Sequence, residues 1–301
     1  MLTTYISDFE RYLLTEKRVS HNTFDAYKRD MSQFVEFMER HAYDMATITT
    51  KELKEFLKEL RQQALSASSV SRKISCLKTF FKHLEEKYGL KNYSEHLVLP
   101  KLEKKLPQFL SEQQIETLFN HAQQASSDND QRNYVMLYFL YATGMRISEL
   151  TELRFSALDF ESGFIKIKGK GGKDRLIPLP QQAQVLLGEY LQTIYPVFLT
   201  KTKGRMNDIL FPTYYNNQLK PMSRQSFWGY IKDMALQAGI STALSPHQIR
   251  HSLATHLLNK GAHLRSIQLL LGHENLKTVQ IYTHIETAHL RKIYDAKHPR
   301  A

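Results

Sequence analysis

The sequence predicts a mainly α-helical protein of two domains, with a small antiparallel β-sheet in the C-terminal domain. Apolar residues recur with helical spacing through most of the first hundred positions. A charged segment, KLEKKL, then lies between Pro100 and Pro107 and follows neither the helical nor the strand period. A single period-two alternation with a glycine-rich turn comes later. We therefore expect an N-terminal helical domain over 1–100, a linker over 101–109 and a C-terminal domain over 110–301.

Four apolar stripes predict four helices in the N-terminal domain, and no strand pattern appears before residue 100. The second helix has Ser20 or Asn22 as its N-cap. Thr49 and Glu52 form a capping-box pattern before the third, and a serine-rich break precedes the fourth. The expected core residues are Leu2, Ile6, Phe9, Leu13, Phe24, Tyr27, Met31, Phe34, Val35, Met38, Leu53, Phe56, Leu57, Leu60, Val70, Ile74, Leu77, Phe81 and Leu84.

Helix-start patterns also occur through the C-terminal domain, at Ser111, Ser223 and Ser245. The apolar run from Tyr134 to Thr143 predicts a buried helix, which Gly144 would end. The remaining expectations are a loop over 125–130, a helix over 181–195, an irregular stretch over 200–220, a helix over 264–271, and core positions for Phe227 and Trp228.

The strongest hairpin signal lies in the middle of the C-terminal domain. The segment 164–167 alternates apolar and polar residues, GKGG follows, and 175–179 returns. Lys170 is at the glycine-flanked tip, where it would reach into a minor groove or toward a leaving oxygen, or would simply be a solvated turn lysine. The segment is not a phosphate-binding Walker loop, because the G-x-x-x-x-G-K-[ST] pattern is absent.

Charge points to a nucleic-acid partner. The chain contains 41 lysines and arginines and 30 acidic residues, which gives a net charge of +11. The positive field of such a protein attracts a polyanion. Basic residues on predicted helix faces are candidate DNA contacts, although each would also suit an ordinary solvated face. These candidates are Lys28, Arg29, Arg72, Lys73, Lys78, Lys82 and Arg224.

Several classes of site are disfavoured. A single cysteine, Cys76, excludes a disulfide framework and a thiolate zinc site. The histidines of the C-terminal third lack the H-E-x-x-H pattern and a convergent pair of carboxylates, so we expect no metal and no cofactor. No apolar run approaches the roughly 18 residues that a membrane span needs. We therefore expect a cytoplasmic protein.

The stretch from 244 to 284 concentrates the candidate chemistry. Serine, proline and glutamine start a helix whose first turn carries His247, and Arg250 lies three residues later on the same face. A guanidinium and an imidazole at the positive end of a helix suit a phosphate. His273 follows the glycine after the next helix, and Tyr282 lies on a separate short segment. Arg146, directly after the buried helix ending at Gly144, is a further phosphate clamp candidate. For His251 and His256 we expect structural roles.

Four motifs together resemble the tyrosine recombinases: YATGMRISEL, KGKGGKDRLIPL, LSPHQIRHSLATHLL and LLGHENLKTVQIYTH. The resemblance covers essentially the whole chain. It implies a SAM-like core-binding domain and a catalytic domain that form a C-shaped clamp on DNA. It also implies that Tyr282 is the nucleophile, that Arg146 and Arg250 stabilise the phosphate charge, and that Lys170 is the general acid. His247 and His273 would assist at the phosphate, without metal or ATP.

The resemblance is greatest to the bacterial enzymes that resolve chromosome dimers. It implies double-stranded DNA as substrate, a tetrameric synaptic complex with a second, related recombinase, and activation by a DNA translocase. The amphipathic tail with Ile285, Leu290 and Ile293 would dock on a neighbouring protomer or fold back on its own domain. A mobile-element integrase, a type IB topoisomerase-like enzyme and a noncatalytic DNA-binding factor are the alternatives.

Overall fold

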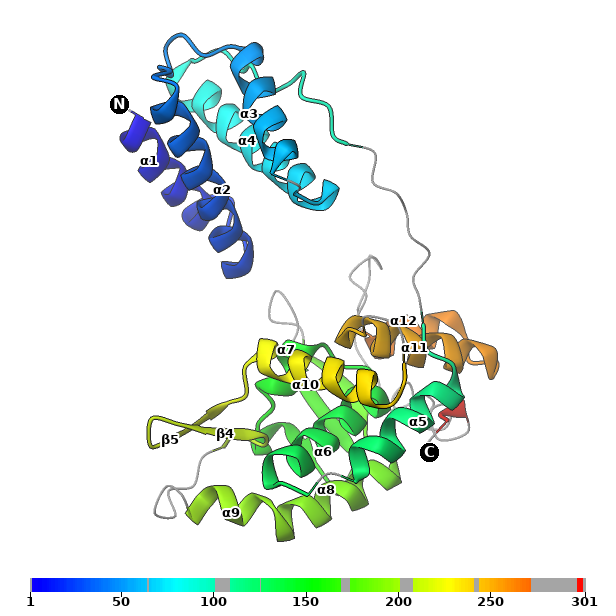
Figure 1. The fold of residues 1–301 in the computed structure, drawn as a ribbon. Helices are drawn as coiled ribbons and strands as arrows, with labels where there is room; N and C mark the ends of the chain where they lie inside the picture. Colours follow the sequence, from blue (N-terminus) through cyan, green and yellow to red (C-terminus); the bar gives the residue numbers. More distant parts are fainter. Residues whose placement is uncertain are drawn as a thin grey trace. The chain divides into compact units, whose positions relative to one another are not determined.

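The chain forms two compact units, Met1–Lys105 and Leu106–Ala301 (Figure 1). The computed structural model describes residues 2–63, 65–100, 109–124, 126–168, 174–200, 208–240, 244–271 and 297–299. These residues are mostly helical, as the sequence predicts, and the second unit contains two small antiparallel sheets, of which the sequence predicts one. Most of the expected linker, residues 101–108, lies outside the described residues. None of the helices in the described part of the chain is long and apolar enough to span a bilayer.

The N-terminal unit is a bundle of the four predicted helices, and its described residues contain no strand. Ser20 caps the second helix by accepting a hydrogen bond from the backbone N–H of Thr23. Thr49 and Glu52 form the predicted reciprocal capping box. Aromatic rings fill the centre, where Phe34 meets Phe80 and Phe56 edge to face. The helices are α1 (Leu2–Thr15), α2 (His21–Arg40), α3 (Thr50–Gln62) and α4 (Ala67–Tyr88).

Two buried carboxylates fasten α4 to the helices beside it. Asp8 of α1 is 4% exposed and accepts hydrogen bonds from Lys87 and from Tyr88, the latter at 2.7 Å. The bond from Lys87 is the main reason that the pKa of Asp8 lies well below its ordinary value. Asp30 of α2, 3% exposed, pairs with Lys73 at 2.7 Å and with Arg72. The charges inside this bundle are therefore paired, as buried charges must be.

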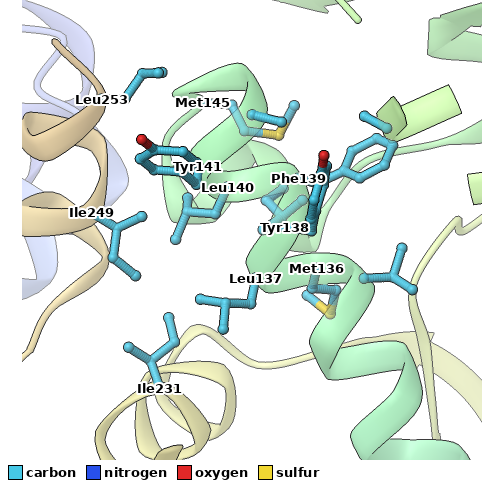
Figure 2. Close-up of a cluster of buried hydrophobic side chains, with 14 of the residues drawn as sticks. Met136, Leu137, Tyr138, Phe139, Leu140, Tyr141, Met145, Ile231, Ile249 and Leu253 are labelled. Carbon is cyan, nitrogen blue, oxygen red and sulfur yellow. The ribbon is translucent and has the colours of Figure 1, made fainter. Parts of the chain in front are cut away.

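The C-terminal unit is organised around one central helix, α6. Nearly every residue of α6 from Arg132 to Thr143 is buried. Four helices, α5, α8, α10 and α11, pack against it. Figure 2 shows Leu137 near Ile231 of α10, and Leu140 beside Ile249 of α11. The helices are α5 (Glu112–Gln123), α6 (Asp128–Thr143), α7 (Ile147–Thr151), the 3-10 helix η1 (Phe155–Ala157), α8 (Gln181–Thr193), α9 (Tyr195–Thr200), α10 (Arg224–Gln237), α11 (Pro246–Asn259) and α12 (Leu264–Leu271).

The predicted hairpin is present. Strand β2 (Phe164–Lys168) pairs with β3 (Asp174–Pro178), and a short strand, β1 (Leu158–Asp159), adds to the other edge of β2. In this register Ile165 lies opposite Ile177, and Ile167 opposite Arg175. The tip at 169–173, with Lys170, lies outside the described residues.

Three expectations for the second unit were wrong. The stretch expected to be irregular contains a hairpin, β4 (Pro212–Tyr215) with β5 (Gln218–Pro221), and helix α9 ends where the stretch begins. Its turn residues Asn216 and Asn217 have φ of 49° and 59°, which asparagine tolerates and which type I′ turns require. The expected loop over 125–130 is shorter, because Ser127 caps α6 and the helix begins at Asp128.

The third error concerns Trp228, which is 42% exposed rather than in the core. Its indole N–H donates to the carbonyl oxygen of Leu244 at 3.1 Å. The ammonium of Lys232 lies 4.1 Å from its ring centroid. A hydrogen-bond donor and a cation–π contact both hold the indole at the surface. Phe227 beside it is fully buried, as predicted.

Candidate active site

The junction between α6 and α7 brings Arg146 to the edge of the site. Gly144 adopts the left-handed conformation, φ 60°, and its N–H donates to Leu140, which ends α6 as predicted. Arg146 is the residue before α7, and its side chain donates from Nη1 to Glu149 Oε1 at 3.0 Å. Its backbone N–H donates to Glu149 Oε2 at 2.7 Å. Glu149 therefore fixes both the backbone and the guanidinium of Arg146.

Glycine at 144 is required by space as well as by φ. A Cβ there would lie 2.8 Å from Cδ2 of Leu253 in α11 and 2.9 Å from Cδ2 of Leu271 in α12. Real Cβ contacts are longer, so a side chain at this position would force these two leucine side chains to shift. The end of α6 thus lies close to α12 and to α11, the helix that carries His247 and Arg250.

The start of α11 follows the predicted pattern. Ser245 and Gln248 form a capping box, with Pro246 in the first turn. His247 is exposed on this first turn, at the end where a helix attracts anions. Arg250, one turn later, is only 6% exposed. The two side chains thus start from one helix face, but Arg250 turns inward.

Arg250 joins three elements. Its Nη1 donates to the carbonyl oxygen of Gly144 at the end of α6, and its Nη2 donates to that of Leu271 at the end of α12. Burial lowers the pKa of Arg250 to about 10, and the charges of Arg146 and Arg175 add to the effect. The group still carries its charge at neutral pH. Three helix ends therefore converge on one buried guanidinium.

Arg175 of β3 completes a cluster around Glu149. It is 7% exposed, and its two Nη atoms donate to Glu149 Oε1 at 2.9 Å and to Oε2 at 2.7 Å. Burial raises the pKa of Glu149, but the hydrogen bonds from Arg175 and Arg146 outweigh it, and the pKa lies below its ordinary value. Arg146, Arg175 and Arg250 thus place an excess of positive charge around the carboxylate of Glu149. Such an arrangement suits a phosphate anion.

Sequence reasoning did not single out Arg175, although a signal was present. Strand alternation places residues 175 and 177 on the same face of the hairpin, and Ile177 is fully buried. An arginine on a buried face requires a carboxylate or carbonyl partner. The pattern could therefore have predicted that Arg175 is paired, but not with which residue.

His256 and His251 have the structural roles expected of them. The Nε2–H of His256 donates to the carbonyl oxygen of Leu110 at 2.8 Å, so its Nδ1 accepts from the hydroxyl of Tyr141, also at 2.8 Å. Ser252 accepts from the N–H of Leu110 at 2.8 Å. Helix α11 thus binds both the backbone N–H and the carbonyl oxygen of Leu110, the first residue after the expected linker. His251 packs edge to face against the ring of Phe109.

Acidification should destabilise the C-terminal unit through His256. Burial lowers the pKa of this imidazole below 6.5, so the unfolded chain takes up the proton first. Its stabilisation is therefore complete at neutral pH and is lost as the pH falls through about 6.5. Melting temperatures measured from pH 7.5 to 5.5 should fall less steeply for His256→Gln than for the wild type. Equal slopes would contradict the prediction, since the other histidines titrate in both proteins.

The candidate DNA contacts occupy different positions. Lys28, Arg29 and Arg224 are exposed, the last at the start of α10. Lys78 is half-buried and donates to the carbonyl oxygen of Glu95 at 3.2 Å. Arg72 keeps 40% of its side chain exposed while it pairs with Asp30. These five basic groups therefore remain at least partly accessible to a ligand.

Lys73 does not match the expectation for a DNA contact. Its ammonium is buried, 2.7 Å from Asp30 Oδ1, and also donates to Gln33. A lysine that neutralises an internal carboxylate has no free side for a phosphate. Of the predicted catalytic residues, Lys170, His273 and Tyr282 lie outside the described residues. The described part of the chain contains no cluster of His, Cys, Asp and Glu that could hold a metal ion.

Comparison with known proteins identifies the family of both units. Residues 108–289 match the model of the phage integrase family, and residues 6–87 match that of the phage integrase N-terminal SAM-like domain. Over 302 aligned residues, covering all of both chains, the protein is 38% identical to tyrosine recombinase XerD of Staphylococcus aureus.

Solved structures show the same fold. The XerH site-specific recombinase bound to its difH substrate matches with a TM-score of 0.72 and 23% identity, over 97% of this chain and 94% of that one. A lambda integrase dimer bound to a COC′ core site matches with a TM-score of 0.66 and 17% identity, over 96% and 94%. The full-length match and both domain matches agree: the chain is similar to XerD over its whole length, and it belongs to the phage integrase family of site-specific DNA recombinases, the tyrosine recombinases.

Proposed function

We propose that this recombinase resolves chromosome dimers at a dif-like site during cell division, in the cytoplasm. The observation that carries the catalytic part is the convergence of Arg146 and Arg250, from helices far apart in sequence, around Glu149. The biological role is supported by full-length similarity to a XerD protein. The net charge of +11 suits a DNA substrate.

Strand cleavage proceeds by attack of the Tyr282 hydroxyl on the scissile phosphorus. The P–O bond to the 5′-oxygen breaks as the P–O bond to tyrosine forms, which leaves a 3′-phosphotyrosine and a 5′-hydroxyl. Arg146 and Arg250 stabilise the charge on the nonbridging oxygens. Lys170 protonates the leaving oxygen, while His247 and His273 transfer a proton or hydrogen-bond to the phosphate.

Joining is the reverse reaction with a different strand. The 5′-hydroxyl of the other duplex attacks the phosphotyrosine, a phosphodiester forms, and tyrosine leaves. Since one phosphodiester bond replaces another, the exchange needs neither ATP nor a metal ion. Two duplexes require four protomers, and we assign two copies each to this protein and a XerC-like partner recombinase. An FtsK-like DNA translocase activates the complex, and the tail after Tyr282 docks on a neighbouring protomer.

The domains divide the work. The N-terminal domain, residues 1–100, binds the DNA core site. Residues 101–109 connect it to the C-terminal domain, residues 110–301, which carries the catalytic groups. Lys28, Arg29, Arg72, Lys78 and Arg224 contact phosphates, which contributes affinity without sequence specificity.

A supercoiled plasmid with two directly repeated binding sites tests the function. The sites come from selection of bound sequences, and the plasmid is incubated with the protein alone and with its candidate partner recombinase. We expect two smaller circles from the two-site plasmid and no such products from a one-site control. Relaxed circles without exchange would instead indicate a topoisomerase-like enzyme, and integration without resolution a mobile-element integrase.

A further inference from the structure

Arg175 makes a two-pronged contact that reaches the catalytic region through Glu149. The guanidinium donates one hydrogen bond to each carboxylate oxygen, at 2.9 Å and 2.7 Å. Parallel bonds of this kind fix the plane of the carboxylate as well as its position. Glu149, 12% exposed, is thus held in one orientation by a side chain from the β2–β3 hairpin.

The same two oxygens hold Arg146. Oε1 accepts from Nη1 of Arg146 at 3.0 Å, and Oε2 accepts from its backbone N–H at 2.7 Å. Any rotation of Glu149 would therefore disturb both contacts with Arg146, whose side chain is 46% exposed. The orientation of Arg146 therefore depends on Arg175 through Glu149.

Stability alone does not account for an arginine at this position. A buried ion pair is often no more stabilising than apolar residues of the same volume. Moreover, the Nε–H of Arg175 is buried and finds no partner among the described residues, which adds an unfavourable contribution. The neighbours of Arg175 along the strand face, Ile177 and the cross-strand Ile167, are apolar. An aliphatic residue would continue that face without these costs.

We propose that Arg175 is a positioning residue of the recombinase: by fixing Glu149 it aims Arg146 at the scissile phosphate. Because Arg175 belongs to β3, it also ties Arg146 to the hairpin whose tip carries Lys170. This inference rests on the proposed catalytic role of Arg146. Arg175 acts through Glu149 and does not itself contact the DNA.

Single-turnover cleavage of a nicked duplex, which traps the covalent product, separates positioning from folding. In Arg175→Gln we expect the cleavage rate to fall by about 10–100-fold, the loss typical of a misplaced catalytic group. Arg175→Lys keeps the charge but not the fork and should lose about 3–10-fold. DNA affinity, measured by fluorescence anisotropy, should stay within about threefold in both, because phosphate contacts elsewhere supply most of it.

A neighbouring ion pair provides the matched control. Asp174, the preceding residue on β3, pairs with Lys166 at 3.1 Å at the surface. Asp174→Asn removes an ion pair from the same hairpin without touching Glu149, and its cleavage rate should remain within about twofold of the wild type. Melting temperatures of all three variants identify any that fail to fold; should Arg175→Gln be one, Arg175→Lys carries the test.

The pH profile gives a readout that a general loss of stability would not produce. Without Arg175 the burial of Glu149 is less well opposed, so its pKa rises. A protonated Glu149 releases Arg146, and the cleavage defect of Arg175→Gln should therefore grow as the pH falls from about 8 to 6. A matching rate for Arg175→Gln and Asp174→Asn, or a defect equal at all pH values and matched by lost DNA affinity, would overturn the inference. Failure of the wild type to trap DNA would instead overturn the proposed function.

Discussion

Replacing Arg250 by alanine should lower the rate of DNA cleavage by about 10²–10³-fold, the usual loss of one transition-state donor. It should also destabilise the C-terminal unit by about 2–4 kcal/mol, because two buried carbonyl oxygens, those of Gly144 and Leu271, lose their donor. A single side chain thus serves both the chemistry and the convergence of α6, α11 and α12. Cleavage is measured in a single turnover, and stability by denaturant unfolding.

Arg250→Lys separates the two contributions. The ammonium keeps the charge and can bond one of the carbonyl oxygens, so more of the stability should remain. Lysine lacks the two Nη donors of the guanidinium, so cleavage should still fall by at least about tenfold. Arg154→Ala is the control, since Arg154 is 57% exposed and lies 3.9 Å from Asp208; it should behave like the wild type. A cleavage rate for Arg250→Ala equal to that of the control would contradict the assignment.

Local patterns predicted the helices well. The capping boxes at Thr49, Ser111 and Ser245 are all present. In each the sequence information lies within four residues, because the side chain and the backbone N–H that it satisfies belong to the same turn. The same holds for the β2–β3 hairpin, whose alternation faces a single core.

Features that depend on particular turns or on context were harder to predict. Asn216 and Asn217 form the β4–β5 turn without a glycine, so the usual asparagine-glycine signal was missing. Trp228 is large and apolar, yet it is 42% exposed, and its N–H donates to the carbonyl oxygen of Leu244. Its apolar character predicted a core position, whereas the hydrogen bond and the contact with Lys232 hold the indole at the surface.

The candidate site shows the clearest limit of sequence. The residue types at Arg146, His247 and Arg250 predicted a phosphate site, because guanidinium and imidazole groups suit a phosphate anion. The acceptors of Arg250 are backbone carbonyls, and every residue has one. No pattern in the chain distinguishes those of Gly144 and Leu271 from the rest. The link from Arg175 to Glu149 spans 26 residues and requires the hairpin and α7 to be placed in space first.

Tyr282→Phe should bind DNA as the wild type does and trap no covalent product. The substitution removes one oxygen, the only atom of that side chain able to attack phosphorus. The positive cluster of Arg146, Arg175 and Arg250 is unaffected, and phosphate contacts supply most of the affinity. The covalent complex is scored as a shifted band on a denaturing gel, and binding is scored on a native one.

A second tyrosine excludes a general effect of the lost hydroxyl. Tyr215 of the β4–β5 hairpin is 61% exposed, and Tyr215→Phe should trap DNA at the wild-type rate. Covalent product from Tyr282→Phe would reassign the nucleophile, whereas loss of DNA binding would give Tyr282 a structural role. If Tyr282→Phe binds DNA but traps no covalent product, then covalent trapping requires the phenolic oxygen of Tyr282. Since the arginine cluster lies within a packed unit while the nucleophile follows α12, that result would assign phosphate binding and attack to separate segments of the chain.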